Sequence, residues 1–259
     1  MEHTENVISK AELKKRRRKN RVKRRLSVLL FLVFCIGSIL VILKAPMFNI
    51  VSISCVGENI VKEADILKKA ELNIGKNIFS TNMSNAVDRI KTIPYISEAK
   101  IKRIFPNKLE ISIIESVPVF AIEENSKLYV LDIEGKLLEI KRPEDKQNLI
   151  QVVGVPVDKL KLGDNIVAKS EGKADDLLEL VSILEKKEML SGVTKLDLED
   201  VTNIKIDIEN RIFIDFGVNE DIEHKVVFLH KIISENIGTT EKVRIDMRGE
   251  KTYVSAINQ

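Results

Sequence analysis

IPYISEAKIKRIFPNKLEISIIESVPVF, residues 93–120, carries the clearest strand pattern in this 259-residue chain. Apolar residues alternate with charged or polar ones in two series, and a period of two is typical of strands that bury one face. The two series are interrupted by Phe105-Pro106-Asn107-Lys108, whose proline and asparagine favour a turn. We therefore expect two strands joined by a tight turn. Their apolar positions are Ala99, Ile101, Leu109, Ile111 and Ile113.

The residues before this stretch predict one more strand and two helices. A short strand opens at Ile50 and ends near Gly57, where glycine suits a turn. Residues 61–72 carry apolar side chains at helical spacing. A second helix, capped by Ser80 or Thr81, should stop before Pro94, because the residue preceding a proline disfavours helical backbone. The order β-α-α-β-β predicts a three-stranded sheet with two helices on one face.

This segment resembles the signature of the FtsQ/DivIB family of bacterial division proteins. The matching motifs are a hydrophobic-Pro-x-hydrophobic turn at Ile93–Ile96, an Arg-x-Φ-Pro motif at Arg103–Pro106, and a strand that ends in Glu-x-x-Pro at Glu115–Pro118. The resemblance implies that residues 47–117 form a POTRA domain, a small module named for polypeptide transport. The signature residues are Pro94, Arg103, Phe105, Pro106, Leu109, Glu115 and Pro118.

An uncharged run, Leu26 to Leu43, predicts a membrane anchor near the N-terminus. As a helix its 18 residues span roughly 27 Å, close to the ~30 Å hydrocarbon core of a bilayer, and the segment 26–46 includes the flanking residues. A cleaved signal peptide is the main alternative, but its apolar region is usually shorter and ends in a small-x-small site. The sequence after Leu43 is Lys44-Ala45-Pro46, which favours a retained anchor.

The charge distribution predicts the orientation of the anchor. Residues 1–43 hold 11 of the 42 Lys/Arg but only 3 of the 39 Asp/Glu, and all 11 basic residues lie between Lys10 and Arg25. Positively charged flanks stay in the cytoplasm. Residues 1–25 are therefore expected to form a basic cytoplasmic tail next to anionic lipid, with the C-terminus outside the cell. The tail lacks aromatic residues for base stacking, so no nucleic-acid partner is expected.

Residues 118–259 predict a second, mostly antiparallel β domain with two helices, which makes the fold class α+β. One helix should cover roughly Lys173 to Leu190, and the other should run from an N-cap at Asn219 to Gly238. The expected strands cover Val119–Ile122, Leu128–Leu131, Leu137–Ile140, Leu149–Val155, Val193–Leu198, Ile204–Ile208, Arg211–Phe216, Val243–Met247 and Tyr253–Ala256.

The last segment again resembles the family. VRIDMRGEKTYV, residues 243–254, is similar to its late Asp-Φ-Arg motif followed by an edge strand. A sheet edge offers unpaired backbone N–H and C=O groups to a partner strand. Tyr253 either anchors such a partner or covers the core of its own domain. The candidate partner-binding residues are Arg248, Thr252, Tyr253, Val254, Ser255 and Ala256.

The sequence contains none of the common catalytic or phosphate-binding motifs that we sought. His224 and His230 are six residues apart on one predicted helix, which is not the spacing of metal ligands. Asp197, Glu199, Asp207 and Glu209 alternate with apolar residues on predicted strands, so they are expected on the solvent face of a sheet. We therefore expect no enzymatic activity, no catalytic or metal-binding residue, no cofactor and no small-molecule substrate.

The family resemblance implies a structural role at the division septum. Members bind small bitopic partners of the FtsB/DivIC and FtsL type outside the membrane and help to place septal wall synthesis. An alternative interpretation is a POTRA-bearing factor for protein translocation or envelope assembly, because POTRA domains also occur in such proteins. A membrane-tethered enzyme is a further alternative, which turnover of cell-wall fragments would reveal.

Overall fold

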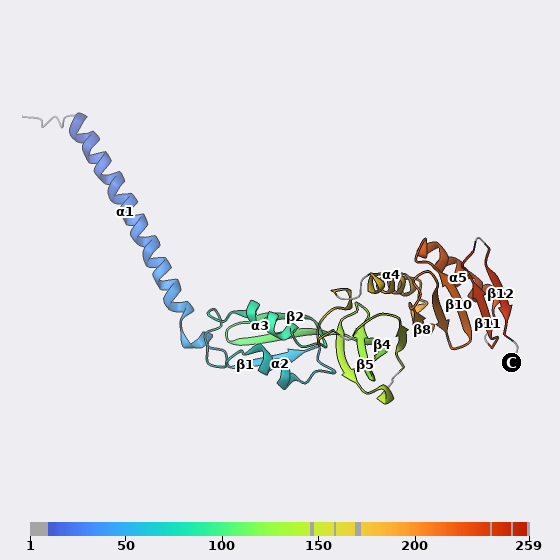
Figure 1. Ribbon diagram of the computed structural model, residues 1–259. Helices are drawn as coiled ribbons and strands as arrows, with labels where there is room; N and C mark the ends of the chain where they lie inside the picture. The colour runs from blue at the N-terminus through green and yellow to red at the C-terminus, as the bar shows by residue number, and fades with distance from the viewer. Residues whose placement is uncertain are drawn as a thin grey trace, which may run out of the picture. The chain divides into compact units, whose positions relative to one another are not determined.

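The computed structural model describes residues 10–145, 148–157, 159–168, 172–238, 240–249 and 251–257 (Figure 1). By its internal contacts the chain divides into two compact units. The first comprises Met1–Ser54, Glu71–Met83 and Ile101–Ile111, and the second comprises Cys55–Ala70, Ser84–Lys100 and Ser112–Gln259. The domain limits expected from the sequence, with a boundary between residues 117 and 118, remain a prediction.

Helix α1 spans Lys10–Leu43, so it includes both the basic run and the apolar run. Its part from Lys23 to Leu43 is long and apolar enough to cross a bilayer. Apolar side chains there are exposed, as on a lipid-facing surface; Phe34, for example, is 70% exposed. The Asn77 side chain donates a 2.8 Å hydrogen bond from Nδ2 to the carbonyl oxygen of Leu43. This bond satisfies one of the carbonyls that a helix end leaves without an intrahelical partner.

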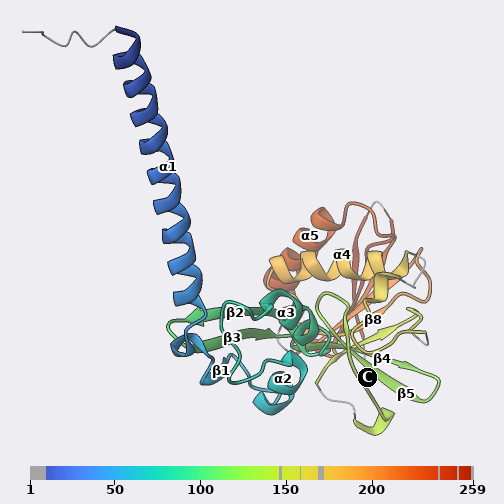
Figure 2. The same cartoon turned by 90° about the vertical axis from the view of Figure 1, so that its left-hand side faces the viewer.

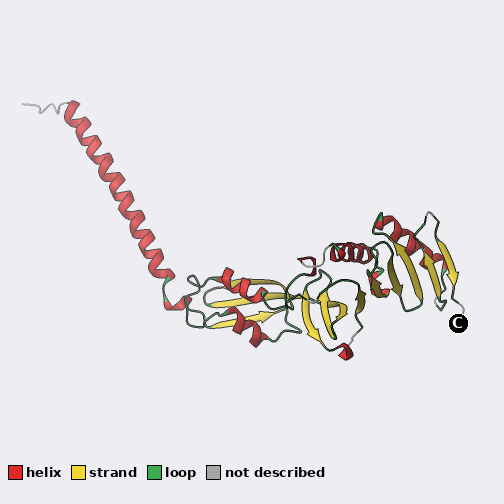
Figure 3. Cartoon of the chain, viewed as in Figure 1, coloured by secondary structure: helices red, strands yellow, loops and turns green. Residues whose placement is uncertain are grey.

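The β-α-α-β-β order predicted for residues 47–117 is confirmed; Figure 3 draws the helices red and the strands yellow. The strands of this segment form one sheet in the order β1-β3-β2. The helices lie between β1 and β2 in the chain, and the turn expected at residues 105–108 connects β2 to β3, except that Lys108 already belongs to β3. The bounds are β1 Ser52–Val56, α2 Glu63–Ala70, α3 Met83–Lys91, β2 Ile96–Ile104 and β3 Lys108–Glu115.

The first unit has a small apolar core of its own. Ile50, Ile78 and Leu109 are buried, and partly buried apolar side chains such as Phe48 and Ile101 pack against them. Backbone hydrogen bonds hold the contributing segments together, since Ile50 N donates to Lys76 O and Val51 N donates to Asn107 O, both at 2.9 Å. Segments far apart in the sequence therefore share one core.

The second unit contains a nine-stranded sheet in the order β12-β11-β10-β9-β8-β7-β4-β5-β6. Five of its eight neighbouring pairs are antiparallel, which agrees with the mostly antiparallel domain expected. The parallel pairs are β4 with β7, β7 with β8, and β10 with β11. The strands are β4 Pro118–Glu124, β5 Lys127–Asp132, β6 Leu137–Lys141, β7 Ile150–Val153, β8 Val193–Asp197, β9 Ile204–Ile208, β10 Ile212–Gly217, β11 Val243–Asp246 and β12 Tyr253–Ala256.

Helices α4, Lys173–Lys186, and α5, Ile222–Asn236, lie next to each other in both views (Figures 1 and 2). Their apolar stripes and one face of the sheet share a single buried cluster. Leu177 and Leu184 of α4 and Leu229 of α5 are at most 1% exposed, as is Phe216 of β10. The sheet is therefore covered on the face toward these helices.

Two hairpin turns of this sheet are defined by local backbone conformation or by local hydrogen bonds. Between β9 and β10, Glu209 and Asn210 both adopt positive φ, 51° and 53°, as a type I′ hairpin turn requires. Between β5 and β6, Asp132 Oδ1 accepts hydrogen bonds from the backbone N–H groups of Glu134 and Lys136, at 3.1 and 2.9 Å. Both hairpins are thus specified locally.

The predicted N-caps were wrong, although α5 ends just before Gly238 as expected. Helix α5 begins at Ile222 and its N-cap is Asp221, whereas the Asn219 side chain donates to carboxylates of α4, to Asp176 Oδ1 at 3.0 Å and to Glu179 Oε2 at 3.2 Å. The hydroxyls of Ser80 and Thr81 donate to the carbonyl of Asn77 instead of capping α3. In each case a tertiary or turn partner competed successfully for the capping side chain. Helix α4 also ends earlier than expected, at Lys186.

Candidate partner-binding edge

Strand β12 lies at one end of the nine-stranded sheet and pairs antiparallel with β11. The register places Val254 opposite Ile245 and Tyr253 opposite Asp246. Within the described residues no further strand pairs with the other side of β12. The strand predicted from the sequence therefore has an open backbone edge.

The hydrogen-bonding direction along β12 follows from one bond beyond it. Ile257 N donates to Lys242 O at 2.8 Å, so these two residues form a hydrogen-bonded antiparallel pair. Hydrogen-bonded pairs alternate with pairs that exchange no bonds. Tyr253 and Ser255 therefore direct their backbone groups toward β11, whereas the N–H and C=O groups of Val254 and Ala256 point to the open edge.

The side chains of β12 are exposed along the whole strand. Tyr253 is 66% exposed and Val254 is 49% exposed. Cross-strand partners share a face, so Val254 lies on the side of the buried Ile245, and Tyr253 lies on the opposite, helix-free side with Asp246. Tyr253 does not cover the domain core, and its part in binding is a proposal.

Arg248 folds back on the end of β11. Its Nε donates to Asp246 Oδ1 at 2.9 Å, and its backbone N–H donates to the same oxygen at 3.1 Å. These side-chain and backbone hydrogen bonds lower the pKa of Asp246 to about 2. The Asp-Φ-Arg motif therefore fixes the turn that leads from β11 toward β12.

The helix-free face of the sheet next to this edge carries mixed charge. Arg244 NH1 lies 3.5 Å from Asp215 Oδ2, and Lys195 Nζ lies 3.3 Å from Asp197 Oδ2. Burial raises the pKa of Asp207, and the neighbouring carboxylates of Asp197 and Asp215 raise it further against the attraction of Lys195. Asp197 and Asp207 lie on the face opposite the core, with Lys195 and Lys205 as cross-strand neighbours, whereas Glu199 and Glu209 lie outside the strands.

The signature residues expected from the sequence serve the fold of residues 48–116. Leu109 is completely buried, and Arg103 Nε donates to Ile78 O at 3.0 Å. Phe105 is exposed but contacts the ring of Phe79, with centroids 5.7 Å apart. Pro94 lies in the turn before β2, Pro106 lies in the turn between β2 and β3, and Pro118 begins β4. These positions hold turns and core rather than a chemical centre.

Glu115 has the most specific contacts of the signature residues. Its two carboxylate oxygens accept hydrogen bonds from Ile60 N at 2.8 Å and Val61 N at 2.7 Å, ahead of α2. Burial opposes ionisation, but the backbone donors of Val61, Ile60 and Asn59 outweigh it and lower the pKa of Glu115 from its ordinary 4.5. The end of β3 is thereby attached to the loop after β1.

We expect Glu115→Gln to lower the free energy of unfolding of residues 48–116 by about 2 kcal/mol at pH 7, because it removes hydrogen bonds to a charged acceptor. The pKa of Glu115 is lower in the folded state than its unfolded-state value near 4.5, so the ionised carboxylate stabilises the fold at pH values above 4.5. This stabilisation is lost as the pH falls through the folded-state pKa. Urea unfolding at pH 7 and at pH 3 measures both effects. The advantage of the wild type over Glu115→Gln should be smaller at pH 3 than at pH 7, and a constant difference would contradict this role.

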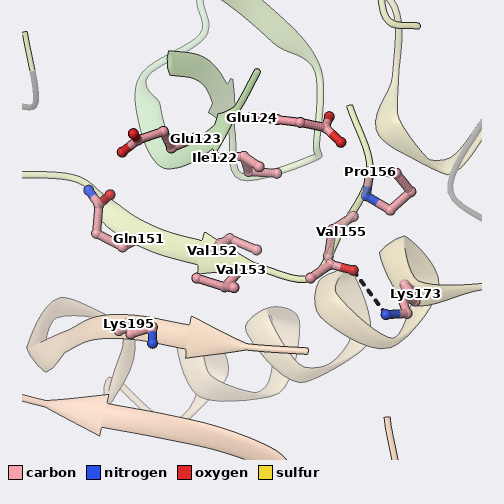
Figure 4. A pocket seen from close by; sticks show the side chains of 11 residues that line it. Ile122, Glu123, Glu124, Gln151, Val152, Val153, Val155, Pro156, Lys173 and Lys195 are labelled. Carbon is pink, nitrogen blue, oxygen red and sulfur yellow. Dashed lines mark hydrogen bonds between the residues drawn. The ribbon is translucent and has the colours of Figure 1, made fainter. Parts of the chain in front are cut away.

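A surface pocket of about 700 Å³ lies at the ends of β4 and β7 (Figure 4). Lys173 Nζ, at its edge, donates to the carbonyl oxygens of Gly154, Leu198 and Glu199 at 3.0–3.1 Å. Glu124 Oε2 accepts a bond from Val157 N at 2.9 Å. The ammonium group of Lys173 thus links the start of α4 to residue 154 and to residues 198–199. The sequence did not predict this structural role, because the carbonyls come from distant parts of the chain.

Potential metal ligands do not gather in the part of the chain that the structure describes, where no group of three or more His, Cys, Asp or Glu side chains could hold an ion. His224 and His230 are both exposed on α5. Cys35 and Cys55 are free thiols. Burial first, and then the carboxylates of Glu63 and Glu58, raise the pKa of Cys55 to about 11, so this thiol is protonated at neutral pH.

Comparison with known proteins identifies the family. Residues 48–116 match the family model of the POTRA domain, FtsQ-type. The chain is 33% identical over 227 residues to the cell division protein DivIB of Clostridium botulinum (strain Loch Maree / Type A3), with 86% of each chain covered. The chain belongs to the FtsQ/DivIB family. It is also 31% identical over 191 residues to DivIB of Clostridium tetani, covering 73% of this chain and 72% of that one. It is 28% identical over 144 residues to the cell division protein FtsQ of Syntrophotalea carbinolica, covering 55% of this chain and 50% of that one.

Membership of the FtsQ/DivIB family confirms the resemblance seen in residues 93–120 and supports a role in the bacterial division complex. The apolar part of α1 fits a single-pass, membrane-anchored member of the family. All three relatives bear the names of cell division proteins, and none of these names states an enzymatic activity.

Proposed function

We propose that this FtsQ/DivIB chain is a non-enzymatic, single-pass scaffold of the division complex. Residues 1–25 lie in the cytoplasm, residues 26–46 cross the membrane, and the POTRA domain of residues 47–117 and the β domain of residues 118–259 lie outside. The outer part binds small bitopic proteins of the FtsB/DivIC and FtsL type. It thereby helps to place and stabilise septal wall synthesis.

The open edge of β12 is the observation that carries this proposal. Its outward N–H and C=O groups, at Val254 and Ala256, can continue the sheet into a strand of a partner. The exposed ring of Tyr253 adds an aromatic side chain of the kind enriched at binding hot spots. The mixed charges of Arg244 and Asp246, on the helix-free face, can favour partners of matching charge.

Imaging in dividing cells tests the location. A fluorescent fusion to the N-terminus is expected to form a band at midcell, and the same fusion lacking residues 243–259 should lose part of that band if partner binding retains it. An even distribution of the full-length fusion around the cell would contradict the division role. The alternative, a POTRA-bearing translocation factor, would instead bind unfolded client chains and show no midcell enrichment.

Protease treatment of intact spheroplasts tests the orientation. The concentration of basic residues before the span predicts that the region after Lys44 faces outward. We expect added protease to digest that region while an epitope tag on residues 1–25 stays protected. The reverse pattern would overturn both the orientation and the proposed binding outside the cell.

A further inference from the structure

Three aromatic rings form a contiguous cluster next to the end of the membrane helix. The rings of Phe48 and Phe79 meet edge to face with centroids 5.2 Å apart, and Phe79 contacts Phe105 at 5.7 Å. Phe105 is 61% exposed and Phe79 is 38% exposed. Aromatic side chains of a folded domain are normally covered, so the exposure of Phe79 and Phe105, from two separate segments, needs an explanation.

Chain connectivity places this aromatic cluster close to the bilayer. The span ends at Leu43, and Phe48 follows five residues later, so it lies at most about 18 Å from the helix end even if the chain is fully extended. The structure shortens that path, because residues Pro46–Phe48 form a 3₁₀ turn and Asn77 bonds the carbonyl of Leu43. Ile78 N also donates to Phe48 O at 2.9 Å, which fixes Phe79 beside the same segment.

The segments around the aromatic cluster carry a basic excess. Residues 44–51, 71–83 and 101–111 contain Lys44, Lys76, Lys102, Arg103 and Lys108 against only Glu71 and Glu110. Lys44, Lys76 and Lys108 are exposed. Outside residues 1–43 the chain as a whole is acidic, so this local reversal of charge is specific to the membrane-proximal end. Basic residues at a bilayer surface are attracted to anionic headgroups.

We propose that the aromatic cluster inserts into the headgroup region of the leaflet at the C-terminal end of the span and seats the POTRA end of the chain on the membrane. Aromatic rings prefer this interface because one side of it is apolar and the other is hydrated. The second contact with lipid, besides the helix, limits how freely the outer part can turn about the anchor. The proposal is independent of partner binding at β12.

Tryptophan fluorescence of the full-length protein tests this contact, because the natural chain contains no tryptophan. Phe105→Trp and Phe79→Trp each introduce a single reporter into the aromatic cluster. The matched control is Phe228→Trp, which replaces a 49% exposed phenylalanine on α5. Each variant is reconstituted in vesicles of phosphatidylcholine and phosphatidylglycerol, with and without bromine on the acyl chains.

We expect the two reporters in the aromatic cluster to shift their emission to the blue and to lose most of their intensity in brominated vesicles, whereas Phe228→Trp keeps its intensity. Equal intensities with and without bromine for both cluster reporters would overturn the proposal. A blue shift without quenching by bromine would also overturn it, because another protein surface rather than lipid would then cover the aromatic cluster.

Discussion

Val254→Pro is expected to weaken binding of an FtsB/DivIC- or FtsL-type partner about 30-fold while the sheet stays folded. The Val254 N–H points to the open edge, so proline removes a donor to the partner and none to β11. An unpaired partner carbonyl costs about 1–3 kcal/mol, and 2 kcal/mol corresponds to roughly 30-fold in Kd. The measurement is a titration of the outer part with the purified partner.

Two variants at the same edge serve as controls for Val254→Pro. Val254→Ala keeps the outward N–H and loses only part of a half-exposed side chain, so it should bind nearly as well as the wild type. Ser255→Pro removes a donor that faces β11 and should detach β12 itself, which far-UV circular dichroism can detect. Unchanged affinity of Val254→Pro would exclude pairing of a partner strand with this edge.

Gly154→Ala is expected to unfold the β domain or to destabilise it by at least about 4 kcal/mol, a large part of the 5–15 kcal/mol typical of a protein. Gly154 follows β7 with φ +88°, and a Cβ there would lie 2.2 Å from Glu199 N and 2.5 Å from Leu198 C. Residues 198–199 are held beside the end of β7, because Leu198 N donates to Val153 O at 2.9 Å. Backbone cannot move aside as a flexible side chain can.

Gly163→Ala separates the effect of this clash from that of backbone conformation. Gly163 has almost the same φ, +87°, but nothing lies within 4 Å of its Cβ position. Gly163→Ala should therefore lower the free energy of unfolding only by the strain of left-handed backbone at alanine, about 1–2 kcal/mol. Urea unfolding of the full chain in detergent compares the two variants. Equal losses would mean that the close approach of Gly154 to residues 198–199 does not persist in solution.

Much of the secondary structure could be predicted locally. The alternation at residues 99–113 gave β2 and β3 because a strand that buries one face must alternate. Glu209-Asn210 separates the strands expected at residues 204–208 and 211–216, and in the β9–β10 turn both residues adopt positive φ. The N-cap predicted for α5 was wrong because a contact between distant segments prevailed: Asn219 is a good cap, but its amide donates to Asp176 and Glu179 of α4.

The candidate site was only half predictable. Tyr253–Ala256 could be identified as a strand, but a strand at the end of a sheet looks the same in sequence as one inside it. The exposure of Tyr253 and the outward direction of the Val254 N–H follow from the pairing with β11. Contacts such as Glu115 with residues 60–61 join segments more than 50 residues apart, and no local pattern records them.

The sequence by itself determined the apolar span, its basic flank, the order of strands and helices and the family, because each depends on residues close together in the chain. The tertiary structure alone decided that the strands after residue 117 form one nine-stranded sheet, that β12 lies at its end, and that three phenylalanines from distant segments meet beside the anchor. Strand neighbours and ring contacts depend on which surfaces pack together, and packing is a property of the whole fold.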